Sequence, residues 1–191
     1  ARGYGWSADG VAFDWTKLIT AKHAELDRLE GVYHRILRES GVEEITGTGR
    51  VADPHTVEVT GADGTRALST ETILVATGGW PHMPDVPGID HAITSNEALD
   101  LDLLPARIAI VGGGYIAVEF AGIFNALGAR VDLILRADNI LRGFDEAVRT
   151  TLRDEMTAKG VHIHCDSRVQ SIEKTTEGYS LRLDQSEILE T

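Results

Sequence analysis

Cysteine is nearly absent from this sequence of 191 residues, which contains only Cys165. A single thiol excludes an intrachain disulfide and any dithiol redox centre built from this chain alone. Long apolar runs are lacking as well, and none approaches the roughly 20 residues of a membrane helix. We therefore expect no membrane partner. Proline is sparse, and three of the five prolines fall within Trp80–Pro87, a stretch that is predicted to connect two modules.

Positive charge is also scarce, since 18 Lys and Arg residues face 30 Asp and Glu residues and give a formal net charge of −12. Such a chain has no basic field with which to release counterions from nucleic acid, so we expect no nucleic-acid partner. A small polyanion can still bind where a few arginines and backbone N–H groups reverse the sign of the charge locally.

The start of the chain lacks the marks of a targeting segment. It begins at Ala1 rather than Met, and it carries neither an apolar signal core nor an Arg- and Ser-rich transit pattern. We expect an internal segment of a longer, cytoplasmic protein. The composition, with 42% hydrophobic and 25% charged residues, is that of a globular protein, and the length allows one or two domains.

The first half of the chain mixes one long helix with short strands. Apolar residues recur at helical spacing over Asp14–Arg38, with Asp14 as the expected N-cap. Val42–Thr46 and Thr56–Val59 are predicted strands, and Gly61–Gly64 is a predicted turn. Glu71–Ala76 is predicted to be a buried strand that leads into Thr77 and two glycines.

Beyond the proline-rich connection the pattern changes to strands that alternate with helices. Such alternation predicts an α/β fold with a doubly wound parallel sheet. The expected elements are a strand Arg107–Val111, a helix Tyr115–Leu127, a strand Arg130–Leu135, a helix Asp145–Lys159, a strand Val161–Cys165, and a hairpin of Val169–Glu173 with Tyr179–Leu183.

A glycine-rich turn between the first strand and helix of this region is the strongest functional signal. Gly112 permits a tight turn, Gly114 lets the backbone approach a pyrophosphate, and the small Ala117 lets helix and strand pack closely. The diphosphate of a dinucleotide is then held at the helix N-terminus. The alternative is a glycine-rich turn without a ligand, but the strand–turn–helix–strand context favours a dinucleotide site.

The charge after the second strand predicts which dinucleotide binds. Enzymes that use NAD usually carry Asp or Glu about 20 residues after the glycine turn, whereas this sequence has Arg136 and then Arg142. A guanidinium can bind the 2′-phosphate of NADPH through two directed hydrogen bonds, and a carboxylate would repel it. The alternative is that both arginines are surface charges, or that Arg142 pairs with Asp138 or Asp145.

With these residues in view, the chain resembles the glutathione reductases. Val111–Phe124 and Arg136–Asp145 are similar to the NADPH domain of that family. Ile73–Gly79 resembles the closing strand of its FAD domain, and Thr94–Glu97 resembles the segment that returns toward the flavin. The resemblance implies a Rossmann-like NADPH-binding domain over 89–191, truncated at its C-terminal end, preceded by the C-terminal part of a related FAD-binding domain over 1–88.

The resemblance also implies roles for individual residues. Tyr115 would be a gate ring over the nicotinamide pocket, and Ile116 would line that pocket. Glu119 would lie near the nicotinamide and pair with a lysine outside this chain. Together with Gly112, Gly114 and Ala117, Arg136 and Arg142 would hold NADPH. The residues that would lie along FAD are Gly49, Ala76, Thr77, Gly78 and Ser95.

Whole members of the family are homodimers that pass electrons from NADPH through FAD and a dithiol to glutathione disulfide. This sequence lacks the family's FAD fingerprint, its cysteine pair and its C-terminal His–Glu pair. We therefore expect the segment alone to be inactive.

Other functions stay open at this stage. A related reductase for trypanothione, mercuric ion or lipoamide would share the fold, although a lipoamide enzyme should have Glu at position 136. A non-catalytic nucleotide-binding module is a further alternative. No metal site is expected, because His162 and His164 beside Cys165 lack an evident further ligand. The three tryptophans, Trp6, Trp15 and Trp80, are expected to be packing residues.

Overall fold

A computed structural model of the chain describes residues 12–184 and 188–191. The chain divides into two compact units, one of residues 20–80 and one that joins residues 81–191 to the chain before position 20. No helix among the described residues combines the length and the apolarity needed to cross a membrane. The expected Trp6 lies outside the described residues.

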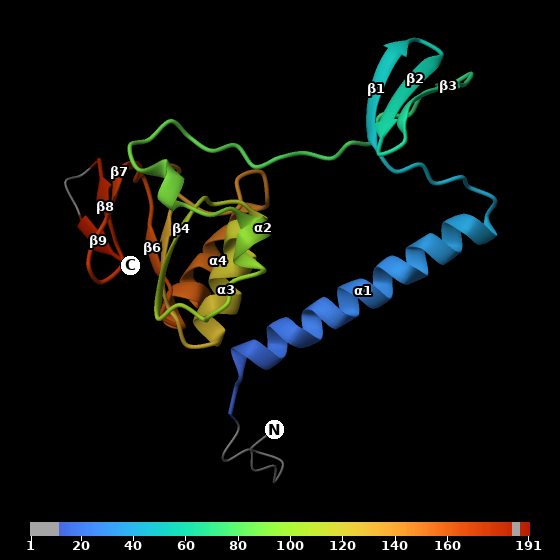
Figure 1. Cartoon of the computed structure of the whole chain (residues 1–191). Coiled ribbons are helices and arrows are strands. Elements are labelled where there is room, and N and C mark those ends of the chain that lie inside the picture. Colours follow the sequence, from blue (N-terminus) through green and yellow to red (C-terminus); the bar gives the residue numbers. More distant parts are fainter. Residues whose placement is uncertain (1–11, 185–187) are drawn as a thin grey trace. The chain divides into compact units, whose positions relative to one another are not determined.

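Helix α1, Trp15–Glu39, confirms the long helix predicted near the N-terminus (Figure 1). Its first turn is capped by Asp14, whose Oδ1 atom accepts a hydrogen bond from the backbone N–H of Lys17 at 3.0 Å. After its last residue the chain turns at Gly41, which has a φ of +75°. Glycine adopts this left-handed conformation without steric strain, which lets the chain leave the helix after Glu39.

The unit of residues 20–80 contains an antiparallel sheet in the order β1-β2-β3, with strands β1 (Thr48–Asp53), β2 (Thr56–Gly61) and β3 (Gly64–Ser69). The predicted turn is confirmed, because Gly61 pairs with Gly64 at the tight end of the β2–β3 hairpin. The predicted strand Thr56–Val59 is confirmed within β2. Strand β3 had no clear signal in the sequence.

Two predicted strands are wrong. Val42–Thr46 is not a strand, because the pairing with β2 starts only at Thr48, opposite Thr60, and does not extend to the residues before it. Glu71–Ala76 is not a buried strand either. The side chains of Leu74 and Val75 are 88% and 68% exposed, and no strand within the described residues lies beside this segment to satisfy its backbone.

The unit of residues 81–191 is built around a parallel sheet in the order β4-β5-β6. The predicted alternation of strands and helices is confirmed, and the α/β class with it. The expected doubly wound arrangement is not confirmed, because within the described residues an antiparallel sheet, and not a second layer of helices, covers the other face of the parallel sheet. The elements are β4 (Arg107–Val111), α3 (Tyr115–Ala126), β5 (Arg130–Ile134), α4 (Glu146–Ala158) and β6 (His162–His164).

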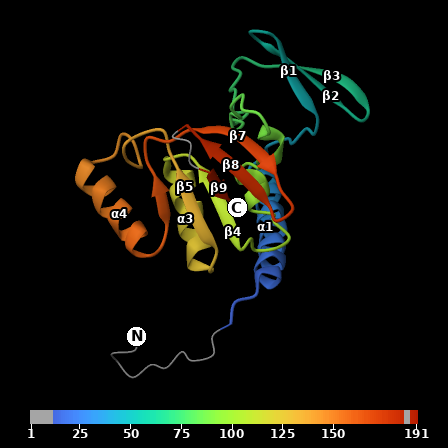
Figure 2. The ribbon, with the colours of Figure 1, turned by 90° about the vertical axis from the view of Figure 1, so that its left-hand side faces the viewer.

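This unit has three layers, with helices on one face of the parallel sheet and a second sheet on the other (Figures 1 and 2). Strand β5 shows why. Val131 and Leu133 pack with Phe124 of α3 and Met156 of α4, whereas Ile134 packs with the antiparallel sheet. Strands β7 (Val169–Lys174), β8 (Tyr179–Leu183) and β9 (Ile188–Glu190) form that second sheet, in the order β7-β8-β9.

The predicted hairpin is β7 and β8, and β9 is an addition to it. Two short elements precede β4, namely the 3-10 helix η2 (Ile89–His91) and helix α2 (Ser95–Ala98). Helix α2 begins with a capping box in which the hydroxyl of Thr94 accepts a hydrogen bond from the backbone N–H of Asn96, and the carboxylate of Glu97 accepts one from the backbone N–H of Thr94. That carboxylate also accepts a hydrogen bond from the Thr94 hydroxyl, which is the main cause of its lowered pKa.

The tryptophans differ in their surroundings. Trp15 packs as expected, because its ring stacks on Phe124 with centroids 6.0 Å apart and its indole N–H donates to the carbonyl of Leu101 at 2.7 Å. The expectation for Trp80 is wrong, since this residue is 80% exposed. Trp80 comes shortly after the exposed segment Glu71–Ala76, which has no neighbouring strand among the described residues, so no apolar surface is formed there for its ring to pack on.

Candidate functional site at the glycine turn

The predicted glycine turn lies between the end of β4 and the start of α3. Gly112 has a φ of +143°, a conformation that favours glycine, and its N–H donates to the carbonyl of Ile134 at 2.9 Å. The end of β4 is thereby fastened to the end of β5. Gly114 is the N-cap of α3 and has no side chain with which to satisfy the N–H groups of the first turn.

The three glycines of the turn have different surroundings. A Cβ on Gly113 would lie 3.0 Å from Cδ1 of Leu135, and a Cβ on Gly112 would lie 3.4 Å from Cβ of Ala117. A Cβ on Gly114 would meet no atom within 4 Å. The first two positions are therefore closely packed, whereas Gly114 borders open space in front of the positive end of α3.

The loop that follows β5 folds back onto this turn. The backbone N–H of Leu141 donates to the carbonyl of Gly113 at 2.6 Å. Leu141 has a φ of +53°, which is uncommon for a residue with a branched side chain. Its side chain and that of Ile140 are buried in the helix-side core, with exposed fractions of 7% and 0%. The core therefore holds the loop against the glycine turn.

The two arginines predicted to bind a phosphate flank this buried pair in the sequence, with Arg136 before it and Arg142 directly after it. Both arginines are exposed. Within residues 12–184 and 188–191, neither the Arg136 nor the Arg142 side chain makes a hydrogen bond or an ion pair. The carboxylates considered as partners of Arg142 have other roles. Asp138 lies 3.7 Å from Arg149, and Asp145 caps α4 by accepting from the backbone N–H of Ala147 at 2.9 Å.

Both guanidinium groups are consequently available to an anion at the carboxyl end of β5. The ends of β4 and β5 are neighbours, since Val111 pairs with Ile134 in the parallel sheet. The site thus combines a helix N-terminus, an open backbone position and two free cations. Such an arrangement can hold a phosphorylated ligand in an otherwise acidic protein.

The residues expected near the nicotinamide begin α3. Tyr115 and Ile116 are the first two residues of the helix and are 61% and 47% exposed. Glu119 is also exposed and follows Tyr115 by four positions, so both side chains lie on one face of α3. They occupy the same end of the helix as Gly114. The apolar exposure of Tyr115 and Ile116 offers a flat ligand a surface to pack on.

The residues expected to bind FAD are not brought together by either unit. Gly49 lies in β1, and residues 76–78 lie in the exposed segment after β3, all within the unit of residues 20–80. Ser95 is the first residue of α2, in the other unit. Within either unit, the described residues do not form a built flavin site.

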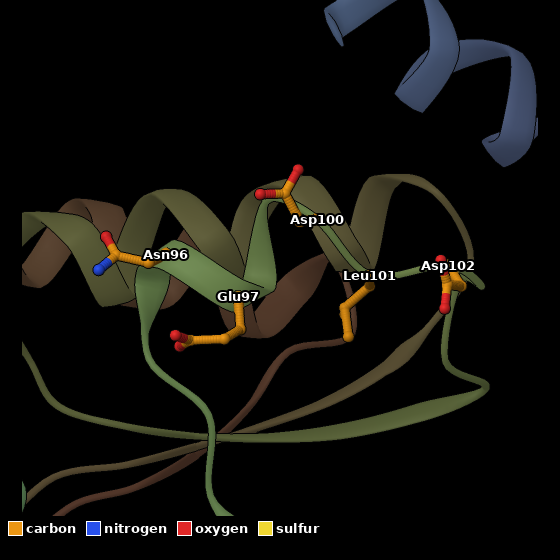
Figure 3. Close-up of a pocket in the computed structure, with 5 residues that line it drawn as sticks. All are labelled: Asn96, Glu97, Asp100, Leu101 and Asp102. Atoms are coloured by element: carbon orange, nitrogen blue, oxygen red, sulfur yellow. The ribbon is translucent and has the colours of Figure 1, made fainter. Parts of the chain in front are cut away.

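One hollow of the second unit differs from the glycine turn in charge. It has a volume of about 370 Å³ and is lined by residues of α2 and the turn after it (Figure 3), namely Asn96, Glu97, Asp100, Leu101 and Asp102. Three carboxylates line this hollow, so it would repel a phosphate. A nucleotide is better matched by the glycine turn.

The paired histidines of β6 face a buried carboxylate. Asp132 of β5 is 3% exposed, and its Oδ1 atom lies 2.9 Å from Nε2 of His164 and 3.8 Å from Nδ1 of His162. Among the described residues, no group of three or more His, Cys, Asp or Glu side chains is arranged to hold a metal ion. Cys165 packs against the core, and this burial raises the pKa of its thiol.

Two residues of the site were missed in the sequence. The role of Leu141 depends on a backbone hydrogen bond to a turn 28 positions earlier in the numbering, for which the sequence carries no local signal. Arg149 follows Glu146 by three positions and has the spacing of an ordinary helix ion pair. Only the fold shows that its guanidinium also reaches the loop.

Comparisons with known proteins agree with this architecture. The family model described as "Pyridine nucleotide-disulphide oxidoreductase" matches residues 4–191. Among solved structures, the HOCl-induced flavoprotein disulfide reductase RclA from Escherichia coli has a TM-score of 0.83 at 25% identity, over 93% of this chain and 41% of that one. A copper(II) complex of a mutant of the same protein has a TM-score of 0.84 over the same shares.

Three relatives bear out the predicted resemblance to glutathione reductases. The glutathione reductase of Burkholderia cepacia is 44% identical over 190 residues, which is 100% of this chain and 41% of that protein. The chloroplastic/mitochondrial enzyme of Pisum sativum is 45% identical over 93% of this chain and 32% of its own length. The glutathione reductase of a Nostoc species is 42% identical over 99% of the chain and 41% of its length.

The chain thus spans less than half the length of each of these relatives. Its match to the family model nevertheless runs through both units, from residue 4 to residue 191. The parallel sheet with its glycine turn and the similarity to flavoprotein disulfide reductases lead to one assignment. The chain belongs to the pyridine nucleotide-disulphide oxidoreductase family.

Proposed function

We propose that this chain binds NADPH at the glycine turn, with the 2′-phosphate held by Arg136 and Arg142. The observation that carries the proposal is the availability of these two guanidinium groups. Both are exposed and make no hydrogen bond or ion pair within the part of the chain that is described. A doubly charged phosphate is the ligand that two free, forked donors at a strand end favour.

The order β4-β5-β6 is that of one half of a Rossmann-like dinucleotide fold, in which the first strand–helix turn receives the pyrophosphate. In the proposal, residues 89–191 bind NADPH, and residues 1–88 contribute to an FAD-binding domain. The open space beside Gly114 fits a pyrophosphate, because a side chain there would occupy it. NADPH, when bound, supplies reducing equivalents at its nicotinamide.

The residues of the chain would then act by binding and orientation. N–H groups at the start of α3 stabilise the pyrophosphate, and the two guanidinium groups fix the adenosine end. Tyr115 covers the nicotinamide and excludes water, Ile116 packs against it, and Glu119 orients it from one helical turn away. These roles are the ones that the resemblance to glutathione reductases implies, and the exposure of all three side chains at the same end of α3 is compatible with them.

For the whole protein we propose an NADPH-dependent reductase of glutathione disulfide, with FAD as a second cofactor, active as a cytoplasmic homodimer. The support is the 42–45% identity to glutathione reductases. Arg136 also argues against a lipoamide enzyme, in which an acidic residue is expected at this position. With Cys165 as its one cysteine, the chain cannot carry out the dithiol step by itself.

A calorimetric titration of the chain with NADPH and then with NADH tests the proposal. We expect NADPH to bind more tightly by about tenfold or more, since a hydrogen bond to a charged group contributes about 1.5–3 kcal/mol. Arg136→Glu should abolish this preference while leaving NADH binding within about threefold. Equal affinities of the unaltered chain for the two nucleotides would overturn it.

Gly114→Ala separates binding from folding. The added Cβ meets no atom within 4 Å, and the φ of Gly114 is −83°, so the variant should unfold at the same urea concentration as the parent. It should still lose affinity for both nucleotides, because the methyl group enters the space assigned to the pyrophosphate. Unchanged binding by a folded Gly114→Ala would move the ligand away from this turn.

A further inference from the structure

Arg149, a third arginine near the site, is engaged by the loop rather than free. Its side chain is 14% exposed, in contrast to the exposed Arg136 and Arg142. The Nε atom donates to the carbonyl of Ile140 at 2.7 Å. Nη1 lies 2.5 Å from Oε2 of Glu146, and Nη2 lies 3.7 Å from Oδ1 of Asp138. Arg149 thus spans the loop from Asp138 to the first turn of α4.

These contacts surround the residue that fastens the loop to the glycine turn. Ile140 is fully buried and directly precedes Leu141, whose N–H donates to the carbonyl of Gly113 at 2.6 Å. The buried Asn139 adds to the same network. Its Oδ1 accepts from the N–H of Ile140 at 2.9 Å, and its Nδ2 donates to Oε1 of Glu146 at 3.2 Å. The left-handed backbone of Leu141 is therefore held from both sides.

The contact of Arg149 with Asp138 involves a charge close in sequence to the two exposed arginines. Asp138 lies between Arg136 and Arg142 in the chain and is 86% exposed. While Arg149 attracts the carboxylate of Asp138, that carboxylate is drawn away from the two free guanidinium groups. Without Arg149, the carboxylate would be free to pair with one of them or to repel a phosphate, and the buried carbonyl of Ile140 would lose its charged donor.

We infer that Arg149 is a positioning residue for nucleotide selectivity, which holds the loop of Arg136 and Arg142 against the glycine turn and keeps Asp138 away from the 2′-phosphate. The inference rests on the proposed NADPH site and adds a residue that keeps its two arginines in place. Arg149 itself does not contact the nucleotide. Its effect is passed on through Asp138 and through the hydrogen bond from Leu141 to Gly113.

The test compares Arg149→Met with Arg153→Met in the chain. Arg153 lies one turn further along α4, and its guanidinium pairs with Asp154 at 3.0 Å rather than with a residue of the loop, so it is the matched control. Arg149→Met should weaken NADPH binding about tenfold or more and NADH binding by less than about threefold. Arg153→Met should change neither affinity. Equal losses for both nucleotides in Arg149→Met would reduce Arg149 to a structural role and overturn the inference.

A double variant supplies a readout that a structural role would not move. Arg149→Met combined with Asp138→Asn removes the released carboxylate and should recover part of the NADPH affinity, while the urea midpoint stays that of Arg149→Met. No recovery would exclude the charge effect. If Arg149→Met does not fold, Arg149→Lys takes its place, because it keeps the charge but not the fork, and it should lose NADPH preference partially.

Measurements on the unaltered chain distinguish a failure of the proposed function from a failure of the inference about Arg149. If it does not prefer NADPH over NADH, the proposed function fails, and the inference fails with it. If the parent prefers NADPH and Arg149→Met keeps the same preference, the inference alone is wrong.

Discussion

His164 of β6 and Asp132 of β5 form a part-buried pair, with Nε2 of the imidazole 2.9 Å from Oδ1 of the carboxylate. The carboxylate also has Arg130 within reach, since Nε of that guanidinium lies 3.4 Å from Oδ2. Asp132 is 3% exposed. A charge buried to this degree is tolerated only with such partners. Along β5, Asp132 alternates with Val131 and Leu133, which face the helices, and shares its face with Ile134, so the pair lies on the side of the parallel sheet that the antiparallel sheet covers.

Replacing Asp132 with Asn should destabilise the chain by about 1–3 kcal/mol, because the charged acceptor is lost while the shape is kept. The free energy of unfolding in urea measures this. Asp154→Asn is the control, since that carboxylate is 63% exposed and pairs only across the surface with Arg153. It should change stability by less than about 0.5 kcal/mol. Equal effects of the two substitutions would contradict the importance of the buried pair.

Trp15→Phe should destabilise the chain by about 0.5–1.5 kcal/mol, the usual contribution of one neutral hydrogen bond. The aromatic packing on Phe124 is kept, but the carbonyl of Leu101 loses its indole donor. Urea unfolding followed by circular dichroism measures the change without depending on tryptophan fluorescence. Trp80→Phe, at a site that is 80% exposed, should be neutral within about 0.5 kcal/mol. A larger loss at position 80 would contradict its exposure.

Sequence reasoning succeeded where the signal was local and repeated. The apolar runs Arg107–Val111 and Arg130–Ile134 alternate with helices of clear periodicity, so β4 and β5 were found together with the turn between them. The glycine turn is predicted by the spacing of Gly112, Gly114 and Ala117 between an apolar strand and a helix, and the φ of +143° at Gly112 agrees with a glycine at that position. Local chemistry therefore predicts the frame of the candidate site.

Prediction from the sequence was wrong where a segment's structure depends on a partner that is distant in the chain. Leu74 and Val75 have the composition of a buried strand, but burial requires a neighbouring strand, and none lies beside them within the described residues. The predicted strand Val42–Thr46 is wrong for the same reason, because no strand in the described part of the chain pairs with it. The hydrogen bond from Leu141 to Gly113 and the reach of Arg149 to Ile140 are set by tertiary packing. Neither can be deduced from spacing alone.

The last prediction concerns pH and His34 of α1. Its Nδ1 atom lies 2.7 Å from Oε1 of Glu44, and its Nε2 atom lies 3.6 Å from Oε1 of Glu30. The hydrogen bond to Glu44 is the main cause that raises the pKa of His34, and the charge of Glu44 and the weaker contact with Glu30 act in the same direction. The protonated imidazole therefore ties the segment after α1 to the helix.

Because the pKa is raised in the folded chain, this stabilising contribution is fully present below the ordinary histidine value of about 6.5. It is lost as the pH rises through the higher pKa of the folded state. A titration of the His34 ring by NMR should show a pKa above that of an exposed histidine, and Glu44→Gln should lower it toward the ordinary value. Glu43→Gln is the matched control, since Glu43 pairs with Arg66 at 3.1 Å, and it should leave the His34 titration unchanged. A His34 pKa that does not respond to Glu44→Gln would show that the tie is absent in solution.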